Sequence, residues 1–281
     1  MPSGKRSKQQ RREGAVAVKG PPPVRSKGVG ARPRQASPRA LAIGGGVLLL
    51  VIVGIAVALV FSRGGGSSWK VPSGTPTIGS TGAEALPGAA QAAALFKGIP
   101  QHGLELGSPK APVRMVMFID LQCPRCQEYE LAALPTIVRK YVRTGKVRIE
   151  LKPWAFIGPD SVRGQLATNA AALQNKAFVF DEVLYLHQGT ENTGWLDDSA
   201  IAQIASSVPG LNVPKLFADH DSAAVQEMQS QSDALAASYK VTGTPTVFVG
   251  RSTGPLKVVG ANGYVPTLQQ TKAAIDSIWG K

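Results

Sequence analysis

Residues 86–281 predict an α/β fold: a β-α-β unit, a block of helices and a closing β-β-α unit. Two mostly apolar runs, 113–121 and 147–151, flank a helical stretch, which predicts two parallel strands joined by a helix. Apolar residues then recur at helical spacing from 160 to 239. Alternation with a period of two returns after this block, so we expect a helical insertion at about 160–240 within one sheet.

The helix of the β-α-β unit is expected from Pro124 to about residue 142. Pro135 lies inside it and should bend it, because the proline ring opposes the carbonyl of Leu131. Within the insertion, apolar stripes predict two longer helices, the second after a cap at Asp221. The stripe residues are Val162, Leu166, Ala170, Leu173 and Ala177 in the first helix, and Val225, Met228, Leu235, Ala236 and Tyr239 in the second.

Shorter segments complete the expected fold. A strand at 241–250 is followed by a turn at 251–255 and a second strand at 256–259, antiparallel because the connection is short. Further helices are expected at 84–96, 178–187, 199–206, 213–219 and 265–278.

Residues 1–39 form a basic tail. They carry eleven Lys or Arg against the single acid Glu13, and so supply ten of the formal net charge of +13. Proline, glycine and serine fill the gaps and few residues are apolar, which predicts a disordered segment. Nucleic-acid binding would suit such a tail, but the apolar segment that follows explains its charge better.

Residues 40–61 are apolar and uncharged, long enough to cross a bilayer as one helix. The positive charge before this run predicts a cytosolic N-terminus and an extracytoplasmic domain of a single-pass protein of the cell membrane. A cleaved signal peptide is the alternative, but its candidate cleavage site at 56–58 lies inside the run, which is longer than a signal sequence requires. The Gly-, Ser-, Thr- and Pro-rich residues 62–85 predict a flexible linker.

The two cysteines of the chain, Cys123 and Cys126, are spaced as C-x-x-C between a predicted strand and a predicted helix. Backbone N–H groups and the helix dipole stabilise a thiolate at a helix N-terminus, so Cys123 is the expected nucleophile. Pro124 suits the first helical turn, and Arg125 adds a cation beside the thiolate. Cys126, one turn later, can attack a mixed disulfide formed at Cys123. The motif therefore favours a redox-active pair.

Two other interpretations of the pair are weaker. A zinc site needs about four ligands, and beyond the two cysteines the sequence offers three separate histidines. A structural disulfide across two residues closes too small a loop to restrain the unfolded chain. No residue pattern suggests a metal, nucleotide or flavin site, so no cofactor is expected.

Residues 98–281 resemble the DsbA-like branch of the thioredoxin fold, in the membrane-anchored form of Gram-positive-type bacteria. The resemblance rests on a C-P-R-C motif preceded by Phe-Ile-Asp, and on a later Gly-Thr-Pro-Thr segment in the same β-α-β, helical, β-β-α order. The residues that carry it are Gly98, Ile99, Pro100, Gln101, Phe118, Ile119, Asp120, Cys123, Pro124, Arg125, Cys126, Phe180, Leu184, Gln188, Gly243, Thr244, Pro245 and Thr246.

The resemblance implies that Pro245 is a cis-proline lying beside the cysteines, with Thr244 offering backbone groups to an extended substrate. Residues alone leave open a trans proline at the start of a strand. Where thioredoxins place a buried acid, this chain has Met117. Asp120 is the nearest acid, and it is either a proton acceptor acting through water or, as we favour, a solvated residue at the strand end.

The function expected from the resemblance is an extracytoplasmic thiol:disulfide oxidoreductase that oxidises cysteine-containing secreted or membrane proteins. A disulfide reductase or isomerase, for instance in cytochrome maturation, is one alternative. A thioredoxin-like binding module without catalysis is another. By analogy, the partner that reoxidises the pair would be a membrane protein of the DsbB or vitamin-K-epoxide-reductase type, and no nucleic acid is involved.

Overall fold

The computed structural model describes residues 68–280. The predicted basic tail 1–39, the predicted membrane anchor 40–61 and residues 62–67 lie outside the described residues. Among the helices of 68–280, none has both the length and the apolar character that a membrane span requires.

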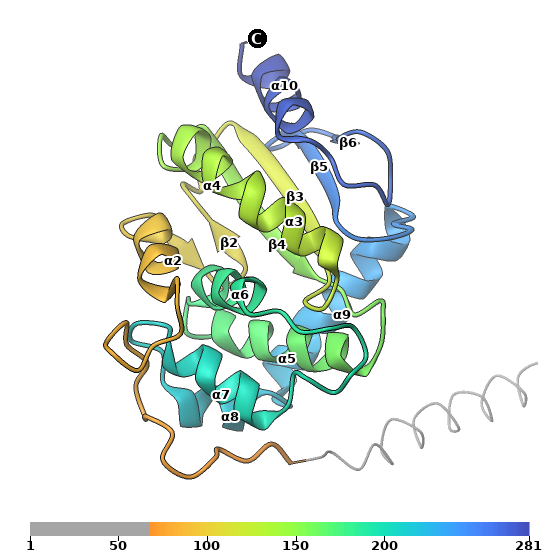
Figure 1. The fold of residues 1–281 in the computed structure, drawn as a ribbon. Coiled ribbons are helices and arrows are strands. Elements are labelled where there is room, and N and C mark those ends of the chain that lie inside the picture. The colour runs from red at the N-terminus through yellow and green to blue at the C-terminus, as the bar shows by residue number, and fades with distance from the viewer. Residues whose placement is uncertain (1–67, 281) are drawn as a thin grey trace, which may run out of the picture. The chain divides into compact units, whose positions relative to one another are not determined.

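A six-stranded sheet forms the centre of the fold, with strand order β1-β2-β4-β3-β5-β6 (Figure 1). β3 and β4 pair in parallel as predicted, with Val113 opposite Val147, and β5 pairs antiparallel with β3 and with β6. The β1–β2 hairpin, which the sequence did not indicate, extends the sheet along β4. The strands are β1 Gln101–His102, β2 Glu105–Leu106, β3 Val113–Ile119, β4 Val147–Pro153, β5 Thr246–Arg251 and β6 Leu256–Val258.

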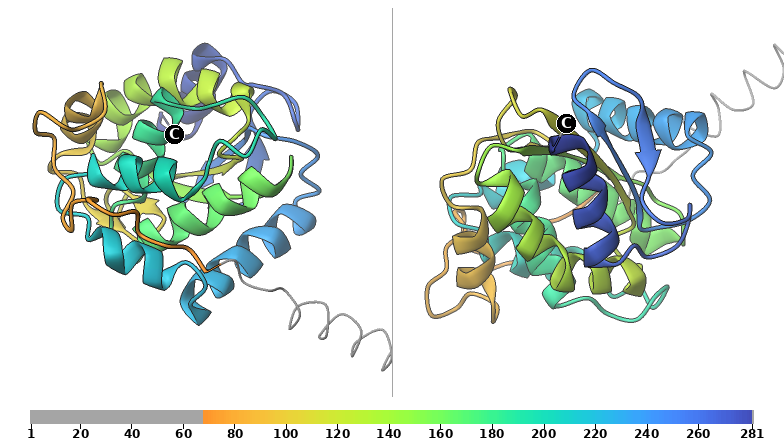
Figure 2. Two further views of the ribbon diagram at one scale, coloured as in Figure 1. Left: turned by 60° about the horizontal axis from the view of Figure 1, so that its bottom comes forward. Right: turned by 90° about the horizontal axis from the view of Figure 1, so that it is seen from above.

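Helices cover both faces of this sheet (Figure 2). α3, α4 and α10 lie on one face and α9 on the other, while α5 to α8 gather beside the sheet (Figure 1). The observed helices are α2 Ala89–Phe96, α3 Pro124–Ala132, α4 Leu134–Ile137, the π-helix η1 Val138–Val142, α5 Pro159–Ala172, α6 Ala177–Leu186, α7 Asp198–Ser206, α8 Val213–Asp219, α9 Ala223–Ser238 and α10 Leu268–Trp279.

β3 is buried on both faces, which explains its unbroken apolar sequence. Met115 and Met117 face the larger core with α3, whereas Val116 and Phe118 face a smaller cluster. In that cluster the ring of Phe248 packs edge-on against Phe118, with centroids 6.0 Å apart. The strand that leads to the cysteines is therefore held from both sides.

The first helix is interrupted near Pro135, as predicted. α3 ends at Ala132 and α4 starts at Leu134, so the break lies directly before the proline. Ala133 still donates its N–H to the carbonyl of Tyr129, at 2.9 Å. Residues 138–142 continue as a π-helix, which widens the last turn before β4.

The apolar stripe predicted for the first insertion helix is only partly correct. Ala170 and Ala177 are buried and Leu166 packs against the core, but Val162 on α5 and Leu173 at its end are 40% and 39% exposed. Polar side chains of α5 are buried in their place. Gln165 donates its side-chain N–H to the carbonyl of Pro153 at 2.8 Å, so burial is compensated by a hydrogen bond. The predicted cap at Asp221 is also wrong by one residue, because Ser222 caps α9.

The predicted flexible linker 62–85 is wrong for its described part. Residues 69–86, which we call the strap, pack against α5, α7, α8 and their loops. Trp69 stacks on His220 with ring centroids 4.3 Å apart, and the guanidinium carbon of Arg163 lies 4.5 Å from the centroid of the Trp69 ring.

The middle of the strap is held by its backbone. Ile78 pairs with Asn212 in an isolated β-bridge. Buried Gly79 leaves no room for a side chain, because a Cβ there would collide with the carbonyl of Val208. The folded domain thus begins well before residue 86.

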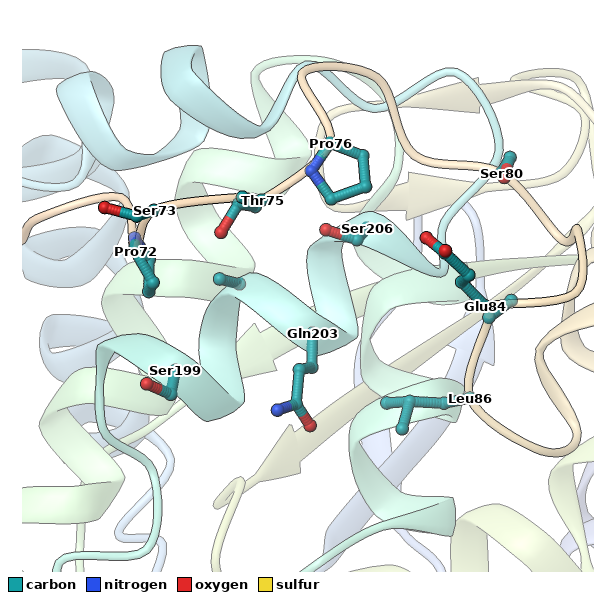
Figure 3. A pocket seen from close by; sticks show the side chains of 13 residues that line it. Pro72, Ser73, Thr75, Pro76, Ser80, Glu84, Leu86, Ser199, Gln203 and Ser206 are labelled. Atoms are coloured by element: carbon teal, nitrogen blue, oxygen red, sulfur yellow. The ribbon is translucent and has the colours of Figure 1, made fainter.

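A polar pocket of about 330 Å³ opens between the strap and α7. Figure 3 shows side chains of the strap, among them Thr75 and Glu84, on one side, and Ser199, Gln203 and Ser206 of α7 on the other. None of its lining residues belongs to the loop that holds the cysteines.

Three buried carboxyl groups lie where α3 packs on α6. Burial raises the pKa of Asp181 to about 8 and that of Glu182 to about 7. Burial also raises the pKa of Glu130 well above its usual value, and the negative charges of Glu182 and Asp181 add to this shift. These acids therefore hold protons in the folded state at a pH where an exposed carboxyl has lost them.

We expect the free energy of unfolding to fall as pH rises from about 5 to about 8. In the unfolded chain these carboxyls lose their protons near pH 4, so over this interval the folded state binds more protons and loses stability as pH increases. Asp181→Asn should flatten the slope, because an amide does not ionise. Chemical denaturation at a series of pH values measures it. Asp197→Asn, at the exposed cap of α7, is the control and should keep the wild-type slope; an unaltered slope in Asp181→Asn would contradict the assignment.

Candidate active site

Cys123 and Cys126 lie at the start of α3, where the sequence placed them. Cys123 is the cap residue with extended backbone angles, and Pro124 is the first helical residue. The Cys123 side chain keeps 6% of its surface exposed, whereas Cys126 is fully buried. Both are free thiols in this structure. An incoming thiol can therefore reach Cys123 and not Cys126.

The two sulfurs differ in acidity. A hydrogen bond from the Cys126 side chain is the largest cause that lowers the pKa of Cys123 to about 6. Burial opposes it, and Thr244 together with the backbone N–H groups of Cys126 and Arg125 reinforces it. Burial and the neighbouring Cys123 raise the pKa of Cys126 well above its usual value. At neutral pH the pair thus consists of a thiolate at Cys123 and a thiol at Cys126.

The segment at Pro245 lies against this pair. The Thr244–Pro245 peptide bond is cis, as the resemblance implied. The Cys123 sulfur lies 3.5 Å from the carbonyl oxygen of Thr244, to which it donates a hydrogen bond when protonated, although the two residues are 121 positions apart. The Thr244 hydroxyl makes no hydrogen bond of ordinary geometry within residues 68–280, but it lies near both sulfurs and lowers the pKa of each.

The Arg125 side chain does not point at the thiolate. It is 71% exposed and forms a 3.1 Å ion pair with Glu128, a surface pair of the kind that contributes little. The part of Arg125 that lowers the pKa of Cys123 is its backbone N–H. Backbone N–H groups at the start of α3, and not the predicted guanidinium of Arg125, therefore stabilise the thiolate.

Asp120 differs most from its expected role, because it is fully buried and not solvated. Its carboxylate accepts the backbone N–H groups of Gln122 at 3.0 Å, Phe156 at 2.8 Å and Ile157 at 3.0 Å. The side chain thus joins the cysteine loop to the segment after β4.

Several amide and hydroxyl side chains around the loop were not indicated as site residues by the sequence. Gln188 donates to the carbonyls of Leu121 at 3.0 Å and Cys123 at 3.3 Å. Gln122 donates to Ser161 at 2.7 Å and accepts the N–H of Asn192 at 2.8 Å. Gln188 was among the residues that carry the family resemblance, and this is the one signal that pointed to the group.

Nothing near the cysteines is arranged to hold a metal. Within residues 68–280 no group of three or more His, Cys, Asp or Glu side chains could bind a metal ion.

Comparisons of sequence and fold relate this chain to known proteins. A sequence profile described as thioredoxin matches residues 101–254. Probable disulfide bond formation protein D of Bacillus cereus is 31% identical over 147 residues, which make up 51% of this chain and 68% of that protein. The chain belongs to the DsbA-like branch of the thioredoxin family.

As a member of this branch, the chain is a thiol:disulfide oxidoreductase. Disulfide bond formation protein D of Bacillus subtilis is 23% identical over 146 residues, which cover 51% of this chain and 66% of that protein. Solved structures share the fold. Oxidised BdbD from B. subtilis superimposes with a TM-score of 0.56 at 21% identity, covering 65% of this chain and 98% of that one. DsbA from Chlamydia trachomatis gives a TM-score of 0.54 at 20% identity, over 64% of this chain and 92% of that one.

We expect Arg125→Ala to leave the pKa of Cys123 nearly unchanged, because the guanidinium pairs with Glu128 and not with the sulfur. Thr244→Val should raise this pKa, since it removes a hydroxyl that stabilises the thiolate. The rate of alkylation of Cys123 as a function of pH measures both. A clear rise in Arg125→Ala would restore the side chain to the role that the sequence suggested.

Proposed function

We propose that this DsbA-like oxidoreductase is an extracytoplasmic oxidase, which introduces disulfide bonds into secreted proteins through Cys123 and Cys126. The observation that carries the proposal is the position of Cys123 at the start of α3, accessible and beside buried Cys126, where its surroundings lower its pKa to about 6. A thiolate that is stabilised in the reduced form makes the disulfide form a stronger oxidant. The names of the Bacillus relatives, disulfide bond formation protein D, support the same direction.

The reaction starts from the Cys123–Cys126 disulfide. A substrate thiolate attacks the accessible sulfur of Cys123, a bond forms between these two sulfurs, and the bond to Cys126 breaks. The electron pair leaves with the Cys126 sulfur, which takes up a proton because burial keeps its pKa high. A second substrate thiolate then attacks the substrate sulfur of the mixed disulfide and releases Cys123 as a thiolate. The substrate loses two electrons and the enzyme gains them.

The substrate is proposed to lie between Thr244 and an aromatic rim at Phe156. The carbonyl of Thr244 lies beside Cys123, so an extended peptide running past it would bring its cysteine to the sulfur. Phe156 is 52% exposed and stacks on Trp154, with ring centroids 5.0 Å apart. The exposed ring of Phe156, supported by the partly buried Trp154, suits the apolar side chains of an unfolded chain.

Cys123→Ser should abolish the oxidation of reduced ribonuclease by the full-length chain, because it removes the sulfur that the substrate attacks. Cys126→Ser should instead accumulate a mixed disulfide when oxidised glutathione is supplied: the Cys123 thiolate attacks it, one glutathione leaves as a thiolate, and the adduct persists because no Cys126 sulfur is present to displace the other glutathione. Gel shift under non-reducing conditions and mass measurement detect this adduct. Full activity in Cys123→Ser would exclude catalysis by the cysteine pair and would favour the alternative of a binding module. A potential low enough to reduce insulin efficiently would favour the reductase alternative.

The membrane location is proposed from the apolar residues 40–61 and the basic residues before them. The partner that reoxidises the pair would then be a membrane protein of the DsbB or vitamin-K-epoxide-reductase type.

In intact cells, a thiol reagent that cannot cross the membrane should label Cys123, because the domain is proposed to face outward. The measurement compares labelling before and after cell lysis, with a cytosolic thiol protein as the control. Labelling that appears only after lysis would place the cysteines in the cytosol and contradict the proposal.

A further inference from the structure

All polar groups of Asp120 are engaged in the cysteine loop or its neighbours. Its backbone N–H donates to the Cys126 sulfur at 3.4 Å. Its carbonyl oxygen accepts the N–H of Cys123 at 3.0 Å and the hydroxyl of Tyr185 at 2.9 Å. One residue therefore contacts both cysteines through its main chain and α6 through the same carbonyl.

The carboxylate of Asp120 extends these contacts to a third segment. One oxygen, Oδ1, accepts the N–H of Gln122 within the loop. The other, Oδ2, accepts the N–H groups of Phe156 and Ile157, which lie 36 and 37 residues later. Phe156 forms the aromatic rim. Hydrogen bonds to a carboxylate are stronger than those between neutral groups, so this connection is firm. The loop and the rim are thus joined through a single side chain.

A proton-carrying role for Asp120 fits this geometry poorly. Both carboxylate oxygens already accept backbone N–H groups. The group of Asp120 that faces the Cys126 sulfur is the backbone N–H. A carrier would need an oxygen that is free to take a proton and directed at that sulfur, directly or through water.

We propose that Asp120 is a positioning residue, which holds the cysteine loop and the rim at Phe156 in one fixed arrangement. The inference rests on the proposed function, in which Cys123 is attacked by a substrate that lies on that rim. In this arrangement the N–H groups of Arg125 and Cys126 stay directed at the Cys123 sulfur, because the start of α3 cannot move away from β3. A substrate bound at Phe156 would therefore act on the position of the cysteine loop, through the hydrogen bond between the Phe156 N–H and Oδ2 of Asp120.

Asp120→Asn in the full-length chain tests this role. An amide keeps the size of the carboxyl group but offers one oxygen, so at least one of the three N–H groups loses its acceptor. We expect the loosened loop to raise the pKa of Cys123 by about one unit, with a matching loss of oxidising potential. Loss of the negative charge alone would stabilise a nearby thiolate and lower this pKa, so the direction of the shift separates the two effects.

The measurements are the pH dependence of Cys123 alkylation, the reduction potential against glutathione and the thermal midpoint. Asp197→Asn is the matched control: its carboxylate also accepts a backbone N–H, from Ala200 at 2.8 Å, but far from the cysteines, and it should leave the pKa unchanged. An unchanged or lowered pKa in Asp120→Asn overturns the proposal. If the unchanged pKa is accompanied by the loss of a pH-dependent step in the rate of oxidation, Asp120 is a proton carrier instead.

A second pair of variants reaches the same contact from the other side. Phe156→Ala removes the ring but keeps the N–H that Asp120 accepts, whereas Phe156→Pro removes both. We expect the proline variant, and not the alanine variant, to raise the pKa of Cys123, and equal values in the two would overturn the coupling. This pair decides the matter if Asp120→Asn does not fold. The pKa of the Cys123 thiol is measured without a protein substrate, so it tests this inference separately from the proposed oxidase function. Full activity in Cys123→Ser would contradict the oxidase function, whereas an unchanged thiol pKa in Asp120→Asn would contradict this inference.

Discussion

The placement of both sulfurs in the first turn of α3, with Cys126 fully buried, is the constraint on which the chemistry of this domain depends. It keeps the Cys126 side chain beside the Cys123 sulfur, where it is the largest cause of the low pKa of Cys123. The backbone N–H groups of Arg125 and Cys126 add to it at the start of α3. Burial works against the thiolate, so the site is a balance in which several short contacts together outweigh the loss of water.

Such contacts act only if the backbone that carries them stays in place. β3 supplies a rigid base, since the strand is buried on both faces and paired on both edges. The insertion closes the other side, where Gly164 of α5 lies so close to Leu121 that no side chain would fit between them. Gln188 then binds the carbonyls of Leu121 and Cys123 from the loop after α6. The cysteine loop is thus enclosed by the sheet, the insertion and the segment of Thr244.

The parts of this arrangement that could be predicted are those with a local signature. The apolar run of β3, the C-P-R-C motif and Pro135 each indicate their structure within a few residues of sequence, and the structure agrees. The place of Thr244 beside Cys123 came from the family resemblance and not from a local pattern. The role of Asp120 could not be predicted from a local pattern, because two of the three N–H groups that its carboxylate accepts lie 36 and 37 residues later. The polar face of α5 was missed for the same reason, since the carbonyl that binds Gln165 belongs to another segment.

The strap alters where this protein can be shortened. Its backbone satisfies polar groups of the insertion, with Val213 donating to Thr77, Gly79 to Leu211 and Ser80 to Ser206. Trp69 covers the ring of His220 and the side chain of Arg163. A fragment trimmed to residue 86 would leave these groups without partners and present bare aromatic surface to neighbouring molecules. Recombinant forms for crystallisation or assay therefore need their first residue at or before Ser68.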